Sequence, residues 1–321
     1  MANQFYLWQK FLSRFRLWKS EKIPVIVDDN PDLGYEKKSR FYFLMIPIIW
    51  LLVLWVAIKK KILGPNLRIN TFWFDGASLT CRQVKENATT WKALDIIYNY
   101  SPGKDKSFGG RITDFWDNLN NIKALRNRLR LVKQILREII DNLSTKESKI
   151  RFISVASGSA QGMIEVMREF KQKGIFIQAI FLDKEPTAIE YSKKLAKKAE
   201  IINQIIFINK SIRELEEVTG GFSPHIVEIV GFWEYRPKEK AIELVRRIYN
   251  LLPSNGVLVM STISPNLEML FSHYVGNWPM YYRNLKQFIE LLTKGGFNPK
   301  DIKIIYEPLK VQKIAICRKS A

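Results

Sequence analysis

The pattern of hydrophobic and polar positions changes along the chain, and each stretch predicts a different kind of structure. From residue 149 onward, short runs rich in Ile, Val and Phe alternate with segments whose apolar residues recur every three or four positions. The runs are IRFISVA, IFIQAIFLD, QIIFIN, HIVEIVG, GVLVMSTI, DIKIIYEP and VQKIAICR. Strands that alternate with helices predict a mostly parallel α/β sheet covered on both faces. Only a short turn near Lys310 separates the last two runs, so they must pair as an antiparallel hairpin.

The preceding part of the chain predicts helices. Residues 118–143 carry apolar side chains at every third or fourth position, which is typical of one long amphipathic helix. Basic residues on its other faces are expected to be solvated or to meet anionic lipid; they are Lys123, Arg126, Arg130, Lys133 and Arg137. Residues 62–117 predict only short helices. We therefore expect a mostly helical extension over residues 62–147 and a sheet domain over residues 148–321.

One earlier stretch is apolar throughout. Residues 41–58 read FYFLMIPIIWLLVLWVAI, without a charge, and basic residues flank both ends. A membrane span needs roughly 17–25 such residues, so we expect a transmembrane or membrane-inserted helix over residues 41–61. A buried core helix is the alternative, although the flanking lysines are difficult to bury. Pro47 also allows a re-entrant segment within one leaflet, and the basic flanks leave the orientation open.

Residues 1–40 combine a basic amphipathic segment with a linker. Bulky apolar residues recur there at helical spacing, namely Trp8, Phe11, Leu12, Phe15 and Trp18. Most basic residues fall outside this stripe, which is typical of a helix in the lipid headgroup region. Docking on the protein's own surface fits the pattern equally well. The stretch IPVIVDDNPDLGYEKK that follows is acidic and rich in turn residues, which predicts a linker.

Composition adds a strong positive charge. The formal net charge is +20, which favours an anionic partner, either nucleic acid or anionic lipid headgroups. A lysine-rich composition spread over solvated faces explains the charge equally well. The two cysteines, Cys81 and Cys317, lie far apart and form neither a metal-binding spacing nor a disulfide framework. We expect no metal site and a reducing, cytosolic setting for the part outside the membrane.

Candidate chemistry lies directly after the first strand, in the sequence SVASGSAQGMIEV. Gly158 and Gly162 bracket a turn that opens into a helix, and glycine is needed where the backbone approaches a ligand closely. The helix N-terminus offers free N–H groups to an anion, and the hydroxyls of Ser157 and Ser159 add donors. The second strand ends at Asp183, where a carboxylate can accept hydrogen bonds from ribose hydroxyls.

These features resemble the class I S-adenosylmethionine (SAM) methyltransferases over residues 149–318. SVASGSAQG resembles the glycine-rich first motif, FLDKEPTAIEYSKK the acidic motif of the second strand, and IVEIVGFWEYRPKEKAIELVRRIYNLLPSNGVLVMSTI the fourth strand, helix and fifth strand. The resemblance implies a Rossmann-like, seven-stranded sheet with a C-terminal antiparallel hairpin, and SAM as the cofactor. It also implies roles for Ser157, Gly158, Ser159 and Gly162 around methionine, Asp183 at ribose, Asn209 or Ser211 near adenine, and Gly231 and Phe232 facing the sulfonium.

The sequence departs from the family at two positions. Ala156 stands where the family usually has an acidic residue, and Ala160 replaces the middle glycine. The alternative, a Rossmann-like dehydrogenase, fits less well because no full G-x-G-x-x-G is present and the terminal hairpin does not suit that topology.

The methyl acceptor is expected to bind near residues 270–285, after the fifth strand. His273 is a candidate catalytic base there, and an aromatic acceptor pocket is expected around it, lined by Tyr274, Trp278, Tyr281 and Tyr282. A structural role for His273 is the competing interpretation. The other histidine, His225, precedes a strand and is expected to be structural.

Together these observations predict a membrane-anchored SAM-dependent methyltransferase with a small-molecule or lipid-like acceptor. Its catalytic domain would face the cytoplasm and its partners would include membrane lipids. One alternative is an RNA methyltransferase that uses the basic surface, although GFWEY stands where amino-group base methylators have N/D-P-P-Y/F. The other is a catalytically silent membrane-associated binding protein with the same fold.

Overall fold

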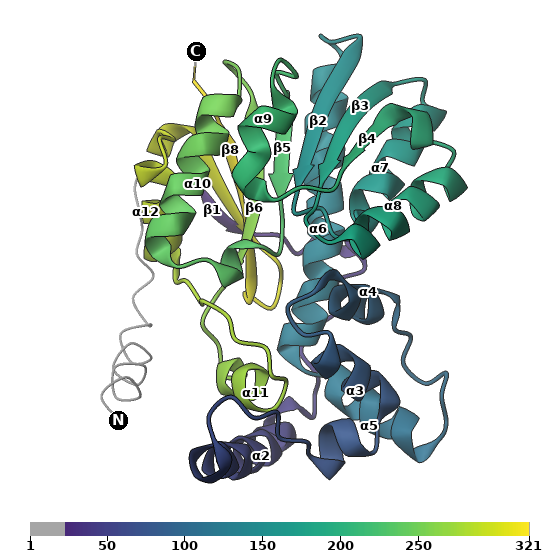
Figure 1. The fold of residues 1–321 in the computed structure, drawn as a ribbon, viewed down its shortest axis with the longest axis vertical. Helices are drawn as coiled ribbons and strands as arrows, with labels where there is room; N and C mark the ends of the chain where they lie inside the picture. Colours follow the sequence, from purple (N-terminus) through teal and green to yellow (C-terminus); the bar gives the residue numbers. More distant parts are fainter. Residues whose placement is uncertain (1–22, 321) are drawn as a thin grey trace.

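The computed structural model describes residues 23–320, so the first part of the segment and linker predicted over residues 1–40, including the apolar stripe from Trp8 to Trp18, lies outside them. An eight-stranded sheet has the order β1-β7-β8-β6-β5-β2-β3-β4 (Figure 1). All neighbouring strands are parallel except β8, which is antiparallel to both β6 and β7. The strands are β1 (Val25–Val27), β2 (Lys149–Val155), β3 (Phe176–Leu182), β4 (Ile205–Ile208), β5 (Ile226–Ile229), β6 (Val257–Ile263), β7 (Ile302–Tyr306) and β8 (Gln312–Arg318). The predicted seven strands and their terminal hairpin are confirmed.

The eighth strand corrects the sequence analysis, which assigned residues 23–38 to a linker. Val25–Val27 form β1, which pairs in parallel with β7 in the register Val25↔Ile304. Three consecutive β-branched residues favour extended backbone, and β1 covers the edge that β7 would otherwise expose. Because acidic and turn-forming residues follow directly, the sequence pattern indicated a linker and not this short strand.

Helices cover both faces of the sheet, and alternate strand residues point to opposite faces. The core on one face includes Phe152, Phe181 and Val259, and the core on the other includes Ile153, Val227 and Met260. The first is covered by α6 (Asn120–Ser144), α7 (Gln161–Gln172) and α8 (Pro186–Lys198), and the second by α9 (Leu215–Thr219), α10 (Lys238–Leu251) and α12 (Leu285–Lys294). The fold is therefore a layered α/β domain, as predicted.

The remaining helices form a group beside the carboxyl ends of the strands, at the bottom of Figure 1. They are α2 (Tyr42–Leu63), the π-helix η3 (Phe72–Gly76), α3 (Leu79–Glu86), α4 (Trp91–Asn99), α5 (Phe108–Asp117) and α11 (Met269–Tyr274). Short 3₁₀ turns complete the chain at η2 (Pro31–Leu33), η4 (Ile202–Gln204), η5 (Ile212–Glu214), η6 (Trp233–Tyr235) and η7 (Pro299–Asp301). The long helix α6 joins this group to the sheet because it contacts α4 as well as α7 and β2.

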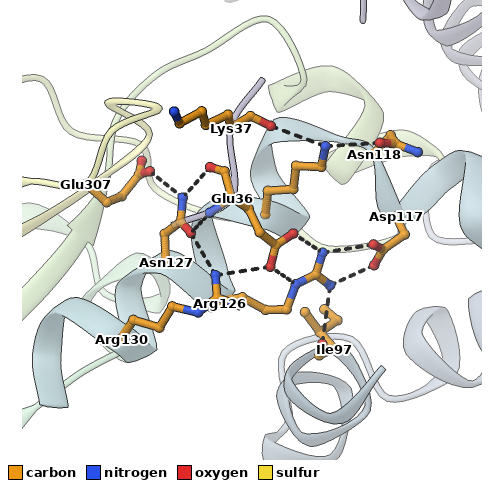
Figure 2. A network of polar contacts seen from close by, with 10 residues as sticks. Glu36, Lys37, Ile97, Asp117, Asn118, Arg126, Asn127, Arg130 and Glu307 are labelled. Atoms are coloured by element: carbon orange, nitrogen blue, oxygen red, sulfur yellow. Dashed lines mark hydrogen bonds and ion pairs between the residues drawn. The ribbon is translucent and has the colours of Figure 1, made fainter. Parts of the chain in front are cut away.

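The basic residues of α6 are not a free solvated face. Lys133 and Arg137 pair with Glu165 and Glu169 of α7. Arg126 is only 7% exposed, and it binds Asp117 and Glu36, which follows β1 (Figure 2). The prediction of a solvated or lipid-facing role was therefore wrong for Arg126, because its partners lie far away in the sequence.

The helix α2 is docked along one face and bare along the other. Met45, Ile49, Val53 and Val56 are buried in a cluster with residues of η3, α5 and α11. The outward side chains are exposed, among them Leu44, Leu51, Leu54 and Ile58. Among the helices of residues 23–320, α2 alone is long and apolar enough to cross a membrane.

Candidate active site

A cavity of about 780 Å³ opens at the carboxyl ends of β2, β3 and β5. Loops after these strands form its floor, and residues of α4 and α6 form its wall. In open α/β sheets, ligands bind at this edge, where the strand order reverses. Here the order reverses between β2 and β5, since the chain passes from β2 to β3 on one side and to β5 on the other. Sequence and topology therefore indicate the same site.

The glycine-rich loop lines this cavity with all its predicted residues, Ser157, Gly158, Ser159 and Gly162. The backbone N–H of Gly158 donates to Asp183 Oδ2 at 2.8 Å, which ties the loop to the end of β3. Ala156 and Ala160 have φ values of 51° and 49°, so both alanines adopt the left-handed conformation that glycine favours. The loop therefore adopts left-handed backbone at two alanines as well as at Gly158.

Two groups in the loop suit a polar ligand. Ser157 Oγ is buried and has no hydrogen-bond partner among the described residues. Ala160 is the N-cap of α7 and supplies no side-chain hydrogen bond, so the first N–H groups of the helix remain available to an anion. An anionic or hydroxyl-bearing ligand in the cavity would satisfy both.

Gly162 serves the packing of two helices as well as the cavity. A Cβ at this position would lie 2.7 Å from Leu129 Cδ1 of α6, which is too close. The missing side chain therefore allows α6 to approach α7 directly.

Asp183 is 8% exposed at the end of β3. Its two oxygens accept the backbone N–H groups of Gly158 and Glu185, while burial raises the pKa of the carboxyl above its ordinary value. Asn209 does not line the cavity; it donates through Nδ2 to the backbone carbonyl of Asp183 at 2.9 Å. Ser211 lines the cavity and caps η5. Asn209 thus supports the strand end, and Asp183 and Ser211 face the ligand space.

The site contains a buried charge cluster that the sequence analysis missed. Arg128 of α6 is 2% exposed, and a Cβ on Gly231 would lie 3.2 Å from both of its terminal nitrogens. Glu228 of β5 accepts a hydrogen bond of 2.6 Å from Ser154, and burial raises its pKa to about 7. Glu234 of η6 is 3% exposed, and burial raises its pKa as well. All three line the cavity, so a cation and two carboxyl groups face the ligand space together.

Trp91 of α4 closes the cavity over the glycine loop. Its ring stacks on Tyr191 of α8 with centroids 4.8 Å apart, and its Nε1 donates to Thr187. A Cβ on Gly158 would lie 3.2 Å from Trp91 Cβ. The helical extension therefore supplies part of the wall of the site.

Comparison with known proteins decides the class of this site. The profile of a family described as "Putative methyltransferase" matches residues 55–308. The chain belongs to this methyltransferase family. The methyltransferase is thus an enzyme, rather than a silent binding protein, and its cofactor is SAM. No curated protein matches its sequence.

Solved structures share the fold of the methyltransferase. A "possible exported protein" from Bordetella parapertussis superposes with a TM-score of 0.62 and 16% identity, over 85% of this chain and 96% of that chain. The CMeT domain of the citrinin polyketide synthase superposes with a TM-score of 0.50 and 13% identity, over 75% of this chain and 65% of that chain. At these identities the likeness concerns the fold alone. The dehydrogenase alternative is excluded by the antiparallel β8 and by the family.

The predicted acceptor residues of the methyltransferase do not form one pocket. Tyr281 and His273 line the large cavity, and His273 is exposed on α11. Trp278 instead lines a second, smaller cavity and donates to Tyr235 Oη at 2.6 Å. Tyr274 packs against the cluster beneath α2, and Tyr282 packs beside Ile263 and Val311. Gly231 and Phe232 both line the large cavity.

Some of these positions could have been found from the sequence. Glu228 is a carboxylate inside an otherwise apolar strand, a pattern that signals a buried ionisable group. Arg128 gave no such signal, because α6 carries many basic residues. Among the described residues no group of His, Cys, Asp or Glu could hold a metal ion, and His225 bonds to Arg151 in a structural role.

Proposed function

We propose that this enzyme transfers a methyl group from SAM to a small or lipid-like acceptor at a membrane surface. The observation that carries the proposal is the cavity at the strand edge, where the glycine-type loop, the carboxylate of Asp183 and the charge cluster face one space. Its volume of about 780 Å³ lies within the range of small-molecule sites.

The loop and the strand ends would hold the cofactor. The unpaired hydroxyl of Ser157 and the free N–H groups of α7 suit the methionine end, with Ser159 and Gly158 beside them. The remaining lone pairs of Asp183 suit ribose hydroxyls. Ser211 and the strand end held by Asn209 lie toward the adenine side, and Gly231 and Phe232 border the transferred group.

When bound, SAM supplies an electrophilic methyl group that is transferred by direct displacement. The chain's task is to align the acceptor and exclude water. Trp91 and α4 cover the loop, which excludes solvent from that side. Partly buried Glu228 and buried Glu234 are the carboxyl groups of the charge cluster able to take a proton from the acceptor. His273 also lines the cavity but is exposed.

The docking of α2 favours a helix that lies in one leaflet rather than one that spans. Its buried face contacts the protein from Met45 to Val56, so the domain would have to enter the bilayer if α2 crossed it. The opposite face is apolar, and Lys38 and Lys59 lie over the rings of Phe43 and Trp55 at 4.3 and 4.1 Å. Aromatic and lysine side chains of this kind suit the interface with anionic lipid. The catalytic domain then faces the cytoplasm, where the methyl donor is made.

Calorimetry tests the central claim. The full chain should bind SAM in a one-to-one complex, and Asp183→Ala should weaken binding at least about tenfold, the equivalent of 1.4 kcal/mol. Asp141→Ala, which removes a carboxylate exposed on α6, is the matched control and should bind normally. A folded wild-type chain that fails to bind SAM would refute the proposal.

A further inference from the structure

A second cavity of about 100 Å³ lies next to the large one, between α3, α4, α5, α6 and α11. Its walls are mostly apolar side chains such as Val84, Leu125, Phe271 and Trp278. The two cavities share six lining residues: Leu94, Arg128, Gly231, Glu234, Tyr235 and Met280. A group placed in the small cavity therefore lies beside the space proposed for the cofactor.

Glu234 lies at the boundary between the two cavities, and its carboxylate lacks hydrogen-bond donors. Neither of its carboxylate oxygens accepts a hydrogen bond from another described residue, although both are buried. Arg128 and Arg283 attract its charge, but attraction alone leaves the oxygen lone pairs unpaired. A buried polar atom without a partner costs free energy and calls for an explanation, such as a ligand that supplies the donor.

The position of Glu234 is fixed by its neighbours in η6. Trp233 Nε1 donates to the carbonyl of Ile229 at 3.1 Å, and Arg283 donates to the carbonyl of Trp233 at 2.7 Å. The backbone carbonyl of Glu234 accepts the N–H of Tyr281 at 2.7 Å. The carboxylate is therefore held at the boundary rather than free to turn toward solvent.

We propose that the small cavity and Glu234 form the acceptor site, and that the acceptor is amphipathic. Its small ring or short alkyl group fills the apolar cavity, and an O–H or N–H group at its polar end donates to Glu234. This inference rests on the proposed function and adds the class of acceptor. An apolar cavity of about 150 Å³ holds a benzene molecule, so the acceptor part in this one is no larger than a single ring.

The geometry also assigns Glu234 a role in the transfer. As the acceptor oxygen bonds to the methyl carbon, Glu234 takes the proton that the oxygen loses, and the electron pair of the broken carbon–sulfur bond stays on sulfur. Burial raises the pKa of Glu234, so its carboxylate is a stronger base than an exposed carboxylate and takes this proton more readily.

Two probes of similar shape test the site by binding alone. ¹⁹F NMR titration of the full chain with 4-fluorophenol and 4-fluorotoluene compares a ring that donates with one that does not. The phenol should bind about tenfold more tightly, as expected for one hydrogen bond to a charged group. Glu234→Met should abolish this preference while the toluene still binds, and Glu234→Gln, which keeps an acceptor oxygen, should reduce it.

A cavity-filling variant separates this site from the cofactor site. Val84 lines only the small cavity, so Val84→Phe should lose both probes and still bind SAM in calorimetry. Leu79→Phe adds a ring to an exposed position of the same helix and should change neither result.

Equal affinity for both probes in the wild type, a preference that survives in Glu234→Met, or probe binding that survives in Val84→Phe would overturn the inference. Absence of probe binding in a chain that binds SAM would also overturn it, while the proposed function would stand. Absence of SAM binding would refute the proposed function whatever the probes do.

Discussion

Arg126 and Glu36 form a two-point ion pair across 90 residues of sequence, with Nε–Oε1 and Nη2–Oε2 distances of 2.5 and 2.6 Å (Figure 2). The same guanidinium binds Asp117 at 2.6 and 2.8 Å. Asn127, the next residue of α6, bonds to the backbone of Glu36 in both directions. This network fastens the chain that follows β1 to the N-terminal third of α6, the helix that links the extension to the sheet.

Arg126→Met should therefore destabilise the fold strongly. It leaves Glu36 and Asp117 facing each other without their shared cation, a change that costs about 3–5 kcal/mol for a buried pair. Burial alone would raise the pKa of Glu36, but the hydrogen bonds and charge of Arg126 hold it below its ordinary value. Urea unfolding measures the loss. Arg130→Met, at a more exposed cation 3.3 Å from Glu36, should cost less than about 1 kcal/mol. Equal losses for both variants would contradict this account.

The sheet was predictable because each strand after residue 149 carries its own apolar signal. The strand β1 was not, since three residues contribute little periodicity and β7 alone makes them a strand. The side chains of α6 show the same limit. Arg126 and Arg128 look like their neighbours in the sequence, yet both are buried. Only the fold brings Glu36, Asp117 and Glu234 to them, and a single sequence does not reveal such distant partners.

Ala160→Gly should stabilise the enzyme. Ala160 has a φ of 49° at the start of α7, a conformation that costs an alanine about 1 kcal/mol or more and costs glycine little. Thermal unfolding should show a gain of about 0.5–1 kcal/mol. Ala188→Gly is the matched control, because this alanine is buried in the regular helix α8, where glycine should destabilise by about 1 kcal/mol. Destabilisation by Ala160→Gly would show that the loop is not strained there.

The glycine-rich loop also shows which parts of the site can be predicted from sequence motifs. Gly158 and Asp183 follow from spacing alone, and the structure joins them by a hydrogen bond. The expected aromatic pocket does not form, because α11 and the chain after it turn Trp278 and Tyr274 away from the large cavity. Where side chains point after a strand depends on the path of the loop, which the spacing of aromatic residues does not encode.

Glu228 should make stability depend on pH. Its pKa is raised to about 7 in the folded enzyme by burial, whereas an unfolded chain has the ordinary lower value. The protonated carboxyl of Glu228 therefore contributes fully to the free energy of unfolding below the unfolded pKa, and this contribution is lost as the pH rises through about 7. Glu228→Gln removes this loss, so the variant should exceed the wild type by roughly 2–3 kcal/mol near about pH 8 and match it near about pH 5. Urea midpoints across this range test the curve, with Glu190→Gln, an exposed carboxyl on α8, as control. Parallel curves for wild type and Glu228→Gln would refute the assignment.

The outward face of α2 should decide membrane binding, together with a second exposed apolar group at the same end of the molecule. Phe72, Trp73 and Phe108 contact one another there and are each more than half exposed. The test is a flotation assay of the full chain with vesicles that contain phosphatidylserine. The double variants Leu51→Ser/Leu54→Ser and Phe72→Ser/Trp73→Ser should each release a large part of the protein from the vesicles. Each leucine or aromatic side chain buried in the membrane contributes about 1.5–3 kcal/mol to the free energy of binding. Phe176→Ser removes an exposed aromatic on β3, at the other end of the molecule (Figure 1), and should leave binding unchanged.

A helix that spans the bilayer would resist extraction by alkaline carbonate, whereas a helix that lies in one leaflet should be extracted. Retention of the wild type after carbonate treatment would therefore refute the one-leaflet arrangement of α2.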